Sequence, residues 1–186
     1  MILVRDEMPS DVVPRERLLD LCFGEGRFAK TSQRLRDGRL PAQGLALTVE
    51  VEGRVAGTVR LWNIAAGPAD GLLLGPIAID PSLQGLGLGS GLMRAALSRA
   101  DRLGHAAVLL VGDAPYYARF GFARCSKLLW MPGPFERDRF LGLELRTGAL
   151  TSASGVVRAT GALDPLNAGA GQVDLTMASY PRRRAA

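Results

Sequence analysis

The sequence predicts an α/β fold in which a mixed, mostly antiparallel sheet carries helices on both faces. Residues 45–51 and 54–61 alternate apolar and polar side chains on either side of Glu52 and Gly53, which is the pattern of an antiparallel hairpin with a tight turn. Residues 72–79 form a near-continuous apolar run, typical of a central strand that is buried on both faces. Helical segments precede and follow these strands.

The first part of the chain is expected to contain a short strand and two helices. Residues 2–5 form the strand, and a helix follows from about Asp11 until Gly24 ends it. A second helix is expected over residues 28–37. Residues 64–71 are rich in Gly, Ala and Pro, and this composition predicts a loop before the central strand.

The central strand and the helix after it have distinctive sequence signals. Pro76 lies inside the apolar run and lacks a backbone donor, so an irregular strand is expected there. The helix that follows is strongly amphipathic and ends at Gly104. Its apolar face comprises Leu92, Met93, Ala96, Leu97 and Ala100.

The remaining elements are shorter. Residues 106–111 predict another buried strand, and residues 116–120 a short helix. Residues 140–145 and 155–159 carry weaker strand signals. We expect one domain over residues 1–160 and a C-terminal extension, residues 161–186, that is partly disordered.

Composition limits the classes of function. The 186 residues are 47% hydrophobic and 22% charged, as in soluble globular proteins. No apolar run is long enough to cross a bilayer and no secretory leader is evident, so we expect a cytoplasmic protein with no membrane partner. Cys22, Cys125 and His105 supply neither a disulfide framework nor a metal site.

The formal charge of +5 arises from 23 basic and 18 acidic residues. A nucleic-acid surface is one explanation of such a balance, and salt-dependent binding would be its mark. The arginines are scattered along the chain, except for Arg182, Arg183 and Arg184. A generally basic, solvated surface without a nucleic-acid partner is therefore the favoured interpretation.

The most informative segment is the glycine-rich stretch 84–91, between the central strand and the amphipathic helix. Glycines allow a sharp turn that brings backbone N–H groups to a ligand, and a helix N-terminus adds partial positive charge, so a phosphate site is predicted. A P-loop would need a lysine in this segment, and none is present. A dinucleotide fingerprint starting at Gly85 or Gly87 would need its third glycine at position 90 or 92. Those positions hold Ser90 and Leu92, so neither register matches.

Two motifs resemble those of the GNAT superfamily of N-acetyltransferases. Gln84-x-x-Gly87-x-Gly89 is similar to the family's loop for the pyrophosphate of acyl-CoA, and Tyr117-Ala-Arg-Phe-Gly-Phe122 is similar to its second signature. The resemblance implies a GNAT-like sheet that splays at the central strand, with acetyl-CoA as cosubstrate and no metal. It also implies transfer of an acetyl group to an amine by direct attack in a ternary complex.

The resemblance also implies roles for particular residues. Backbone groups of the central strand would hold the pantetheine arm and the thioester carbonyl, while the N–H groups of the glycine turn would hold the pyrophosphate. Arg119 would reach a CoA phosphate, or would simply be solvated. The expected cofactor-binding residues are Ile77, Ala78, Ile79, Gln84, Gly85, Leu86, Gly87, Leu88, Gly89, Ser90 and Arg119.

Tyr117 is the expected catalytic residue. It lies where many relatives keep a tyrosine that protonates the leaving thiolate, a task that suits a phenol. Tyr116 is the alternative acid, and packing in the core is the alternative role of Tyr117. Asp113 replaces an asparagine common among relatives and either contacts CoA or caps the short helix.

The general base and the acceptor are not identified by the sequence. Glu50 and Asp80 are the weak candidates for a base, and Glu25 is a candidate member of the substrate pocket. The acceptor is expected to be a small-molecule or peptide amine, and pairing of late strands between subunits would give a homodimer. A non-catalytic module that binds acyl-CoA as a sensor is the alternative function.

Overall fold

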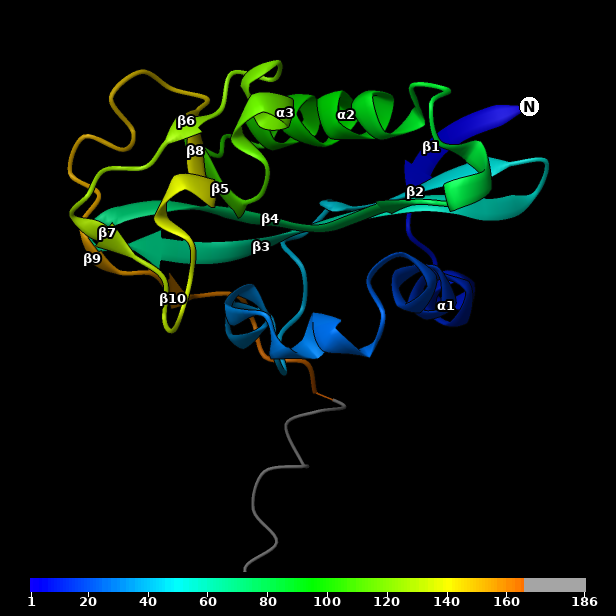
Figure 1. Cartoon of the computed structure of the whole chain (residues 1–186), viewed down its shortest axis with the longest axis horizontal. Coiled ribbons are helices and arrows are strands. Elements are labelled where there is room, and N and C mark those ends of the chain that lie inside the picture. The colour runs from blue at the N-terminus through cyan, green and yellow to red at the C-terminus, as the bar shows by residue number, and fades with distance from the viewer. Residues whose placement is uncertain (166–186) are drawn as a thin grey trace, which may run out of the picture.

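The protein, described by a computed structural model over residues 1–165, contains an eight-stranded sheet between two helical layers (Figure 1). The strand order is β1-β2-β3-β4-β5-β8-β6, with β10 added beside β3, and β4 and β5 form the parallel pair among antiparallel neighbours. The strands are β1 (Ile2–Asp6), β2 (Ala46–Val51), β3 (Arg54–Ala66), β4 (Ala69–Ile79), β5 (Ala107–Val111), β6 (Ala123–Arg124), β8 (Phe140–Glu144) and β10 (Arg158–Ala159). The predicted fold class is confirmed.

Helices cover both faces of the sheet. Helices α2 (Leu88–Arg102) and α3 (Ala114–Ala118) lie on one face, and α1 (Val12–Phe23) lies on the other with the 3-10 segments η2 (Glu25–Ala29) and η3 (Thr31–Leu35) (Figure 1). Within residues 1–165, no helix combines the length and the apolar character that a membrane span requires. The other short elements are η1 (Pro9–Asp11), η4 (Pro81–Leu83), η5 (Arg137–Arg139) and the separate strand pair β7 (Leu129–Trp130) and β9 (Gly155–Val156).

The central strand β4 has a core on each face, as its apolar run predicted. Leu72 and Leu74 pack in a cluster with Leu92 and Met93 of α2. Leu73, which points to the opposite face, packs in a second cluster that includes Leu35 of η3. Because both faces are buried, the position of β4 is fixed between the two helical layers.

One expected loop is a hairpin. Residues 64–71 were expected to be a loop, but β3 continues to Ala66 and β4 begins at Ala69, leaving a turn at Gly67 and Pro68. Ile64 is buried in the sheet core, and small side chains such as Ala66 fit beneath the 153–157 segment. The Gly, Ala and Pro content therefore reflects close packing around a two-residue turn.

The prediction of an α-helix over residues 28–37 is wrong, because the segment forms 3-10 turns. The segment forms η2 and η3, which are separated at Lys30 by an extended backbone (φ −66°, ψ 136°). Arg34 donates to the carbonyl of Pro132 at 2.9 Å, and Thr31 bonds to that of Pro134, so contacts with a distant segment determine the local conformation.

Strand β4 is irregular at Pro76, as predicted. Val59 pairs with Ile77, but Leu61 pairs with Leu74, so one residue of β3 lies opposite Gly75 and Pro76. The indole N–H of Trp62 donates to the carbonyl oxygen of Gly75 at 2.6 Å. This hydrogen bond holds the bulge in place at the centre of the sheet.

The sheet opens between β4 and β5. These strands pair only through Leu72 with Val108 and Leu73 with Leu109, and β4 then continues to Ile79 without a partner on that side among the described residues. The splay implied by the family resemblance is therefore present. It exposes backbone groups of β4 in the middle of an otherwise buried sheet.

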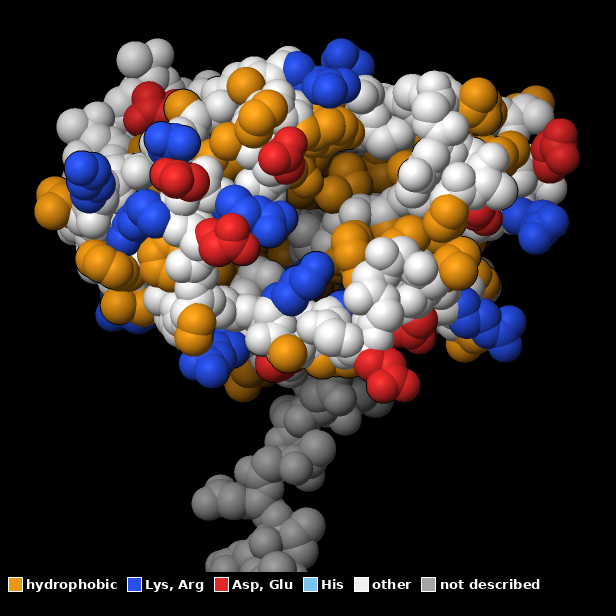
Figure 2. Space-filling model, in the orientation of Figure 1, with side chains coloured by type: hydrophobic (Ala, Val, Ile, Leu, Met, Phe, Trp, Pro, Cys, Tyr) orange, Lys and Arg blue, Asp and Glu red, His pale blue; other side chains and the backbone are white. Residues whose placement is uncertain are grey.

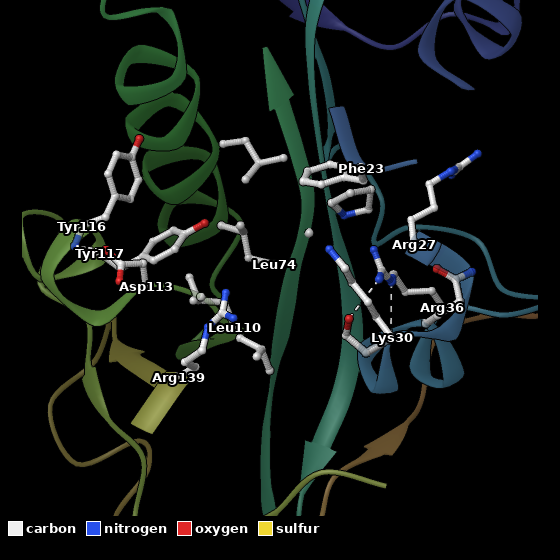
Figure 3. Close-up of a pocket in the computed structure, with 17 residues that line it drawn as sticks. Phe23, Arg27, Lys30, Arg36, Leu74, Leu110, Asp113, Tyr116, Tyr117 and Arg139 are labelled. Carbon is white, nitrogen blue, oxygen red and sulfur yellow. Dashed lines mark hydrogen bonds between the residues drawn. The ribbon is translucent and has the colours of Figure 1, made fainter. Parts of the chain in front are cut away.

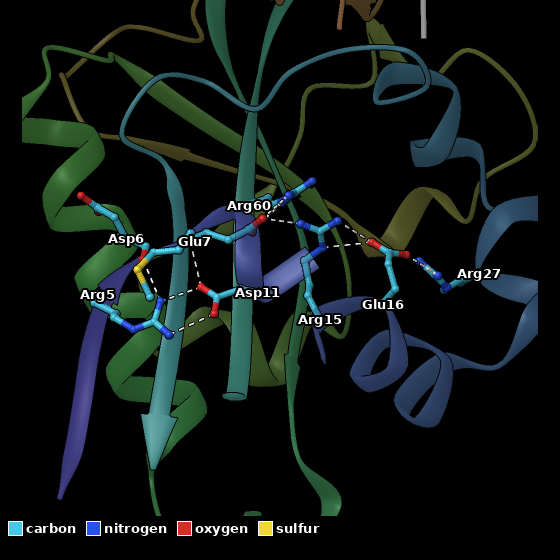
Figure 4. A network of polar contacts seen from close by, with 9 residues as sticks. Arg5, Asp6, Glu7, Asp11, Arg15, Glu16, Arg27 and Arg60 are labelled. Atoms are coloured by element: carbon cyan, nitrogen blue, oxygen red, sulfur yellow. Dashed lines mark hydrogen bonds and ion pairs between the residues drawn. The ribbon is translucent and has the colours of Figure 1, made fainter. Parts of the chain in front are cut away.

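A network of ion pairs ties α1 to the sheet (Figure 4). Arg5 of β1 donates to both carboxylate oxygens of Asp11, at 2.6 and 3.0 Å. Glu7 pairs with Arg15 of α1 and with Arg60 of β3, and the distance from Arg60 Nε to Glu7 is 2.8 Å. The orientation of α1 against the sheet is thereby fixed by charge as well as by packing.

The network continues into η2. Glu16 accepts hydrogen bonds from Arg15 at 2.7 Å and from Arg27 at 2.6 Å, and Asp20 accepts from Arg27 at 2.8 Å. Two carboxylates therefore neutralise the charge of Arg27.

The end of the described chain returns to the segment before β2. The N–H of Leu40 bonds to the carbonyl of Ala162, and that of Asp164 to the carbonyl of Gly38, each at 2.9 Å. The domain boundary at residue 160 stays a prediction, and most of the expected extension, including the arginines at 182–184, lies outside the described residues.

Candidate active site

The glycine turn leads directly into helix α2. Asp80 caps η4 by accepting a hydrogen bond from the N–H of Ser82 at 2.9 Å. Gly85 and Gly87 then adopt positive φ angles of 82° and 78°, and Gly87 is the N-cap of α2. A side chain at either position would be strained, which explains why glycine occupies both.

Six consecutive N–H groups in this turn have no hydrogen-bond acceptor among the described residues. No hydrogen bond among residues 1–165 uses the N–H of residues 85–90, and the first intrahelical bond runs from Gly91 to the carbonyl of Gly87 at 2.9 Å. All of these residues except Leu86 border a cavity of about 480 Å³ at the positive end of α2. We call this the cofactor cavity, because unpaired donors at a helix N-terminus suit a phosphate group.

The structure brings nearly all the predicted site residues to this cavity. Leu86 is the exception, since its side chain is 66% exposed and does not line the cavity. The residues that do line it are Ile77, Ala78, Ile79, Gln84, Gly85, Gly87, Leu88, Gly89, Ser90, Tyr117 and Arg119. Their assignment to the cofactor stays a prediction.

Tyr117 lies between the cofactor cavity and a second cavity (Figure 3). Its ring packs edge-on against Phe122, with 5.9 Å between centroids, and lies so close to Gly112 that a Cβ there would overlap it. Its hydroxyl has no hydrogen-bond partner among the described residues. Burial raises the pKa of Tyr117, so the hydroxyl keeps its proton at neutral pH.

Tyr116 and Arg119 lie toward the glycine turn. A Cβ built on Gly89 would be 3.8 Å from the Tyr116 hydroxyl, and the guanidinium of Arg119 stacks 4.4 Å from the centroid of the Tyr116 ring. Asp113 caps α3 by accepting from the N–H of Tyr116 at 3.3 Å. The structure thus shows the capping role for Asp113.

The second cavity, about 350 Å³, lies where β4 and β5 diverge and extends to η2 and η3. It shares Ile77, Tyr116 and Tyr117 with the cofactor cavity, so the two meet at these side chains. The surface is hollowed near the centre of the face seen in Figure 2, with apolar side chains in the hollow and basic ones near its rim. We call this the acceptor cavity.

Four basic residues line the acceptor cavity, and sequence reasoning did not select them. They are Arg27, Lys30, Arg36 and Arg139, which we call the basic wall (Figure 3). Burial lowers the pKa of Arg36 to about 10, and burial together with Arg36 and Arg139 lowers the pKa of Lys30. The run of basic residues between 27 and 39 was the available signal, but it does not reveal which side chains point inward.

The candidate bases do not reach either cavity. Glu50 pairs with Arg5 at 2.7 Å, and Asp80 caps η4. Glu25, the candidate for the substrate pocket, is exposed on η2 and does not line the acceptor cavity. Of the described carboxylates, Asp113 is the one that lines the acceptor cavity.

Neither cysteine lines the cofactor or the acceptor cavity. Cys22 contacts the carbonyl of Ile79 at 3.4 Å, and burial raises the pKa of Cys125 to about 12. A thiol with such a high pKa is a poor nucleophile at neutral pH.

The splayed sheet and the donor-rich N-terminus of α2 are features of a protein that binds a phosphate-bearing ligand beside an open sheet edge. The chain belongs to the GNAT family of acetyltransferases: the model of the Acetyltransferase (GNAT) family matches residues 15–122. The resemblance to the GNAT superfamily that the two motifs indicated is confirmed, and the protein is an N-acetyltransferase.

Individual relatives agree with this assignment. The chain is 33% identical over 162 residues to the uncharacterized N-acetyltransferase YhbS of Escherichia coli K12, covering 84% of this chain and 95% of the relative. The crystal structure of Escherichia coli YhbS in complex with CoA superimposes with a TM-score of 0.69 and 30% identity, over 86% of this chain and 89% of that one. A GNAT acetyltransferase from Brucella melitensis in complex with acetyl-CoA gives a TM-score of 0.57 and 25% identity, over 75% and 94%.

Proposed function

We propose that the protein transfers the acetyl group of acetyl-CoA to an amine by direct attack within one ternary complex. The observation that carries this proposal is the row of six unpaired N–H groups, residues 85–90, beside the gap between β4 and β5. The CoA-bound structures of YhbS and of the Brucella relative support the choice of cosubstrate.

The proposed arrangement assigns each part of acetyl-CoA to a part of the site. The N–H groups of residues 85–90 bind the pyrophosphate, with Arg119 at the edge of the same cavity. The pantetheine arm follows the unpaired edge of β4 along residues 77–79, so the thioester reaches the gap beside Tyr117.

The chemistry is acyl transfer without a covalent enzyme intermediate. The neutral amine in the acceptor cavity attacks the thioester carbon, the C–S bond breaks, and Tyr117 gives its proton to the departing thiolate. The nitrogen becomes positively charged on attack and loses its proton to water. Neither cysteine is placed to form an acyl-enzyme.

A non-catalytic acyl-CoA module is less well supported, since a binding module does not need an acid at the boundary of two cavities. The expected cytoplasmic location, the homodimer and the lack of nucleic-acid or membrane partners stay predictions.

Calorimetric titration with acetyl-CoA and CoA, with NAD and ATP as controls, tests the proposal. We expect selective binding of the CoA species in the micromolar range, about −8 kcal/mol. If well-folded protein binds neither CoA species, the cofactor assignment is wrong and the glycine turn is structural.

A further inference from the structure

The acceptor cavity carries more positive charge than the described carboxylates neutralise. Arg27 is paired with Glu16 and Asp20, so its charge is already balanced. Lys30 forms no ion pair with a residue in 1–165, and its ammonium lies 4.6 Å from the centroid of the Phe23 ring.

Arg36 is the most unusual member of the basic wall. Its side chain is nearly buried, with 9% of the residue exposed, and its hydrogen bonds go to the carbonyl and hydroxyl of Ser32, at 3.2 and 3.0 Å. No carboxylate among residues 1–165 lies within ion-pair distance of it. A buried guanidinium with neutral partners alone is costly unless an anion joins it.

Arg139 adds a third weakly compensated charge. Its described ion pair is with Glu136 at 3.4 Å, and both side chains are at least half exposed, so this contact neutralises little. Arg139 lines the same cavity as Lys30 and Tyr117, so its charge faces the space that they share.

The cavity has two chemically different ends (Figure 3). Tyr117 and the gap between β4 and β5 lie at one end, where the proposed function puts the reacting amine. Lys30 and Arg36 come from the opposite helical layer and form the other end. The volume of about 350 Å³ is that of a small-molecule site.

We propose that the acceptor is a small amine that also carries an oxyanion, a carboxylate or a phosphate, which Arg36 and Lys30 bind while the amine lies beside Tyr117. The inference rests on the proposed function, because it assumes that the cavity receives the acceptor. A planar guanidinium beside an ammonium matches the geometry and charge of both oxyanions.

The first experiment compares acceptors in matched pairs with the full-length enzyme. The carboxylate arm uses β-alanine and its amide, and the phosphate arm uses phosphoethanolamine and ethanolamine. We expect the anionic member of at least one pair to have a kcat/KM about 10-fold or more above its neutral partner, mainly through KM. The arm that shows the preference identifies the oxyanion.

Variants test which residues create that preference. Arg36→Gln and Lys30→Gln should each reduce the ratio of anionic to neutral kcat/KM toward one. Arg17→Gln is the control, since Arg17 is an exposed arginine of α1 that lines neither cavity, and it should retain the ratio.

A binding measurement decides the question even if none of these amines is the natural acceptor. The protein is saturated with CoA, so that anions cannot occupy the cofactor cavity, and is titrated with malonate or inorganic phosphate while its thermal midpoint is followed. We expect the midpoint to rise for wild type and Arg17→Gln and to rise much less for Arg36→Gln and Lys30→Gln. Equal responses of all four proteins, or no response of any, would overturn the inference.

The inference and the proposed function fail in different ways. If the cofactor assignment is wrong, calorimetry will show no binding of acetyl-CoA. If only the inference is wrong, acetyl-CoA will bind normally, and neutral amines will be acetylated at the same rate as their anionic partners.

Discussion

Tyr117 is the single residue on which the proposed chemistry depends most directly. Its ring is fixed by Phe122 and by the close approach to Gly112, while its hydroxyl stays unpaired at the boundary of the two cavities. Core packing and catalysis, the two roles that the sequence left open, are therefore compatible. The ring packs in the core, and the hydroxyl remains available as the acid.

Replacing Tyr117 by Phe removes the proton donor and retains the packing. We expect kcat to fall about 100-fold, within the range for loss of a general acid, with acetyl-CoA binding unchanged in calorimetry. Tyr116→Phe is the matched control, because its hydroxyl lies near Gly89 instead, and it should change kcat less. An unaltered kcat in Tyr117→Phe would remove this residue from the acid role.

At the scale of elements, the turn before α2 could be predicted because its signal is local. The spacing of Gly85, Gly87 and Gly89 and the apolar face of α2 lie within one contiguous segment, so residue order alone indicated the cavity that they border. The cap by Asp113 was likewise an open alternative that local sequence suggested.

Gly87→Glu should weaken acetyl-CoA binding at least about 100-fold. The new carboxylate would repel the pyrophosphate, and the positive φ of 78° would strain any residue with a side chain. The matched control is Gly91→Glu, which adds the same charge one helical turn later, where the N–H already bonds to Gly87 and the residue does not line the cofactor cavity. Calorimetry measures both, and comparable losses would argue against the turn as the phosphate site.

The elements that were predicted wrongly depend on distant parts of the chain. Residues 28–37 form two 3-10 segments because Thr31 and Arg34 bond to the 132–134 segment, and residues 64–71 complete a hairpin that packs against residues near 154. Local composition carries no information about such partners, so it indicated a helix and a loop instead.

At the scale of the whole molecule, the acceptor cavity was beyond sequence reasoning for the same reason. Its walls come from four separate parts of the chain, represented by Lys30, Leu74, Val111 and Arg139. The two motifs predicted the cofactor side and the sheet, whereas the basic wall exists only after β4 and β5 have diverged and η3 has packed opposite them.

The ion-pair network predicts how the stability of the whole fold depends on pH. Hydrogen bonds from Arg5 hold the pKa of Asp11 below its ordinary value, so the folded state binds this proton less tightly than the unfolded chain does. The stabilisation is therefore complete above the ordinary pKa of about 4 and is lost as the pH falls through the lowered folded value.

Asp11→Asn should consequently lower the free energy of unfolding by about 2 kcal/mol at pH 7, since Asp11 is nearly buried and accepts from both Arg5 and the N–H of Met8. Urea denaturation at a series of pH values measures the difference, which should shrink below about pH 4. Asp101→Asn, on the exposed side of α2, is the control and should have little effect. A difference that is independent of pH would show that charge is not the cause.

The meeting of two cavities at one gap has a consequence for the kinetic order of the enzyme. The cofactor cavity is formed on the side of α2 and α3, and the acceptor cavity extends to η2 and η3 on the opposite side of the sheet. On the proposed assignment, neither ligand obstructs the route of the other. Free CoA can therefore depart while the acetylated product is still bound, so that product release need not follow a compulsory sequence.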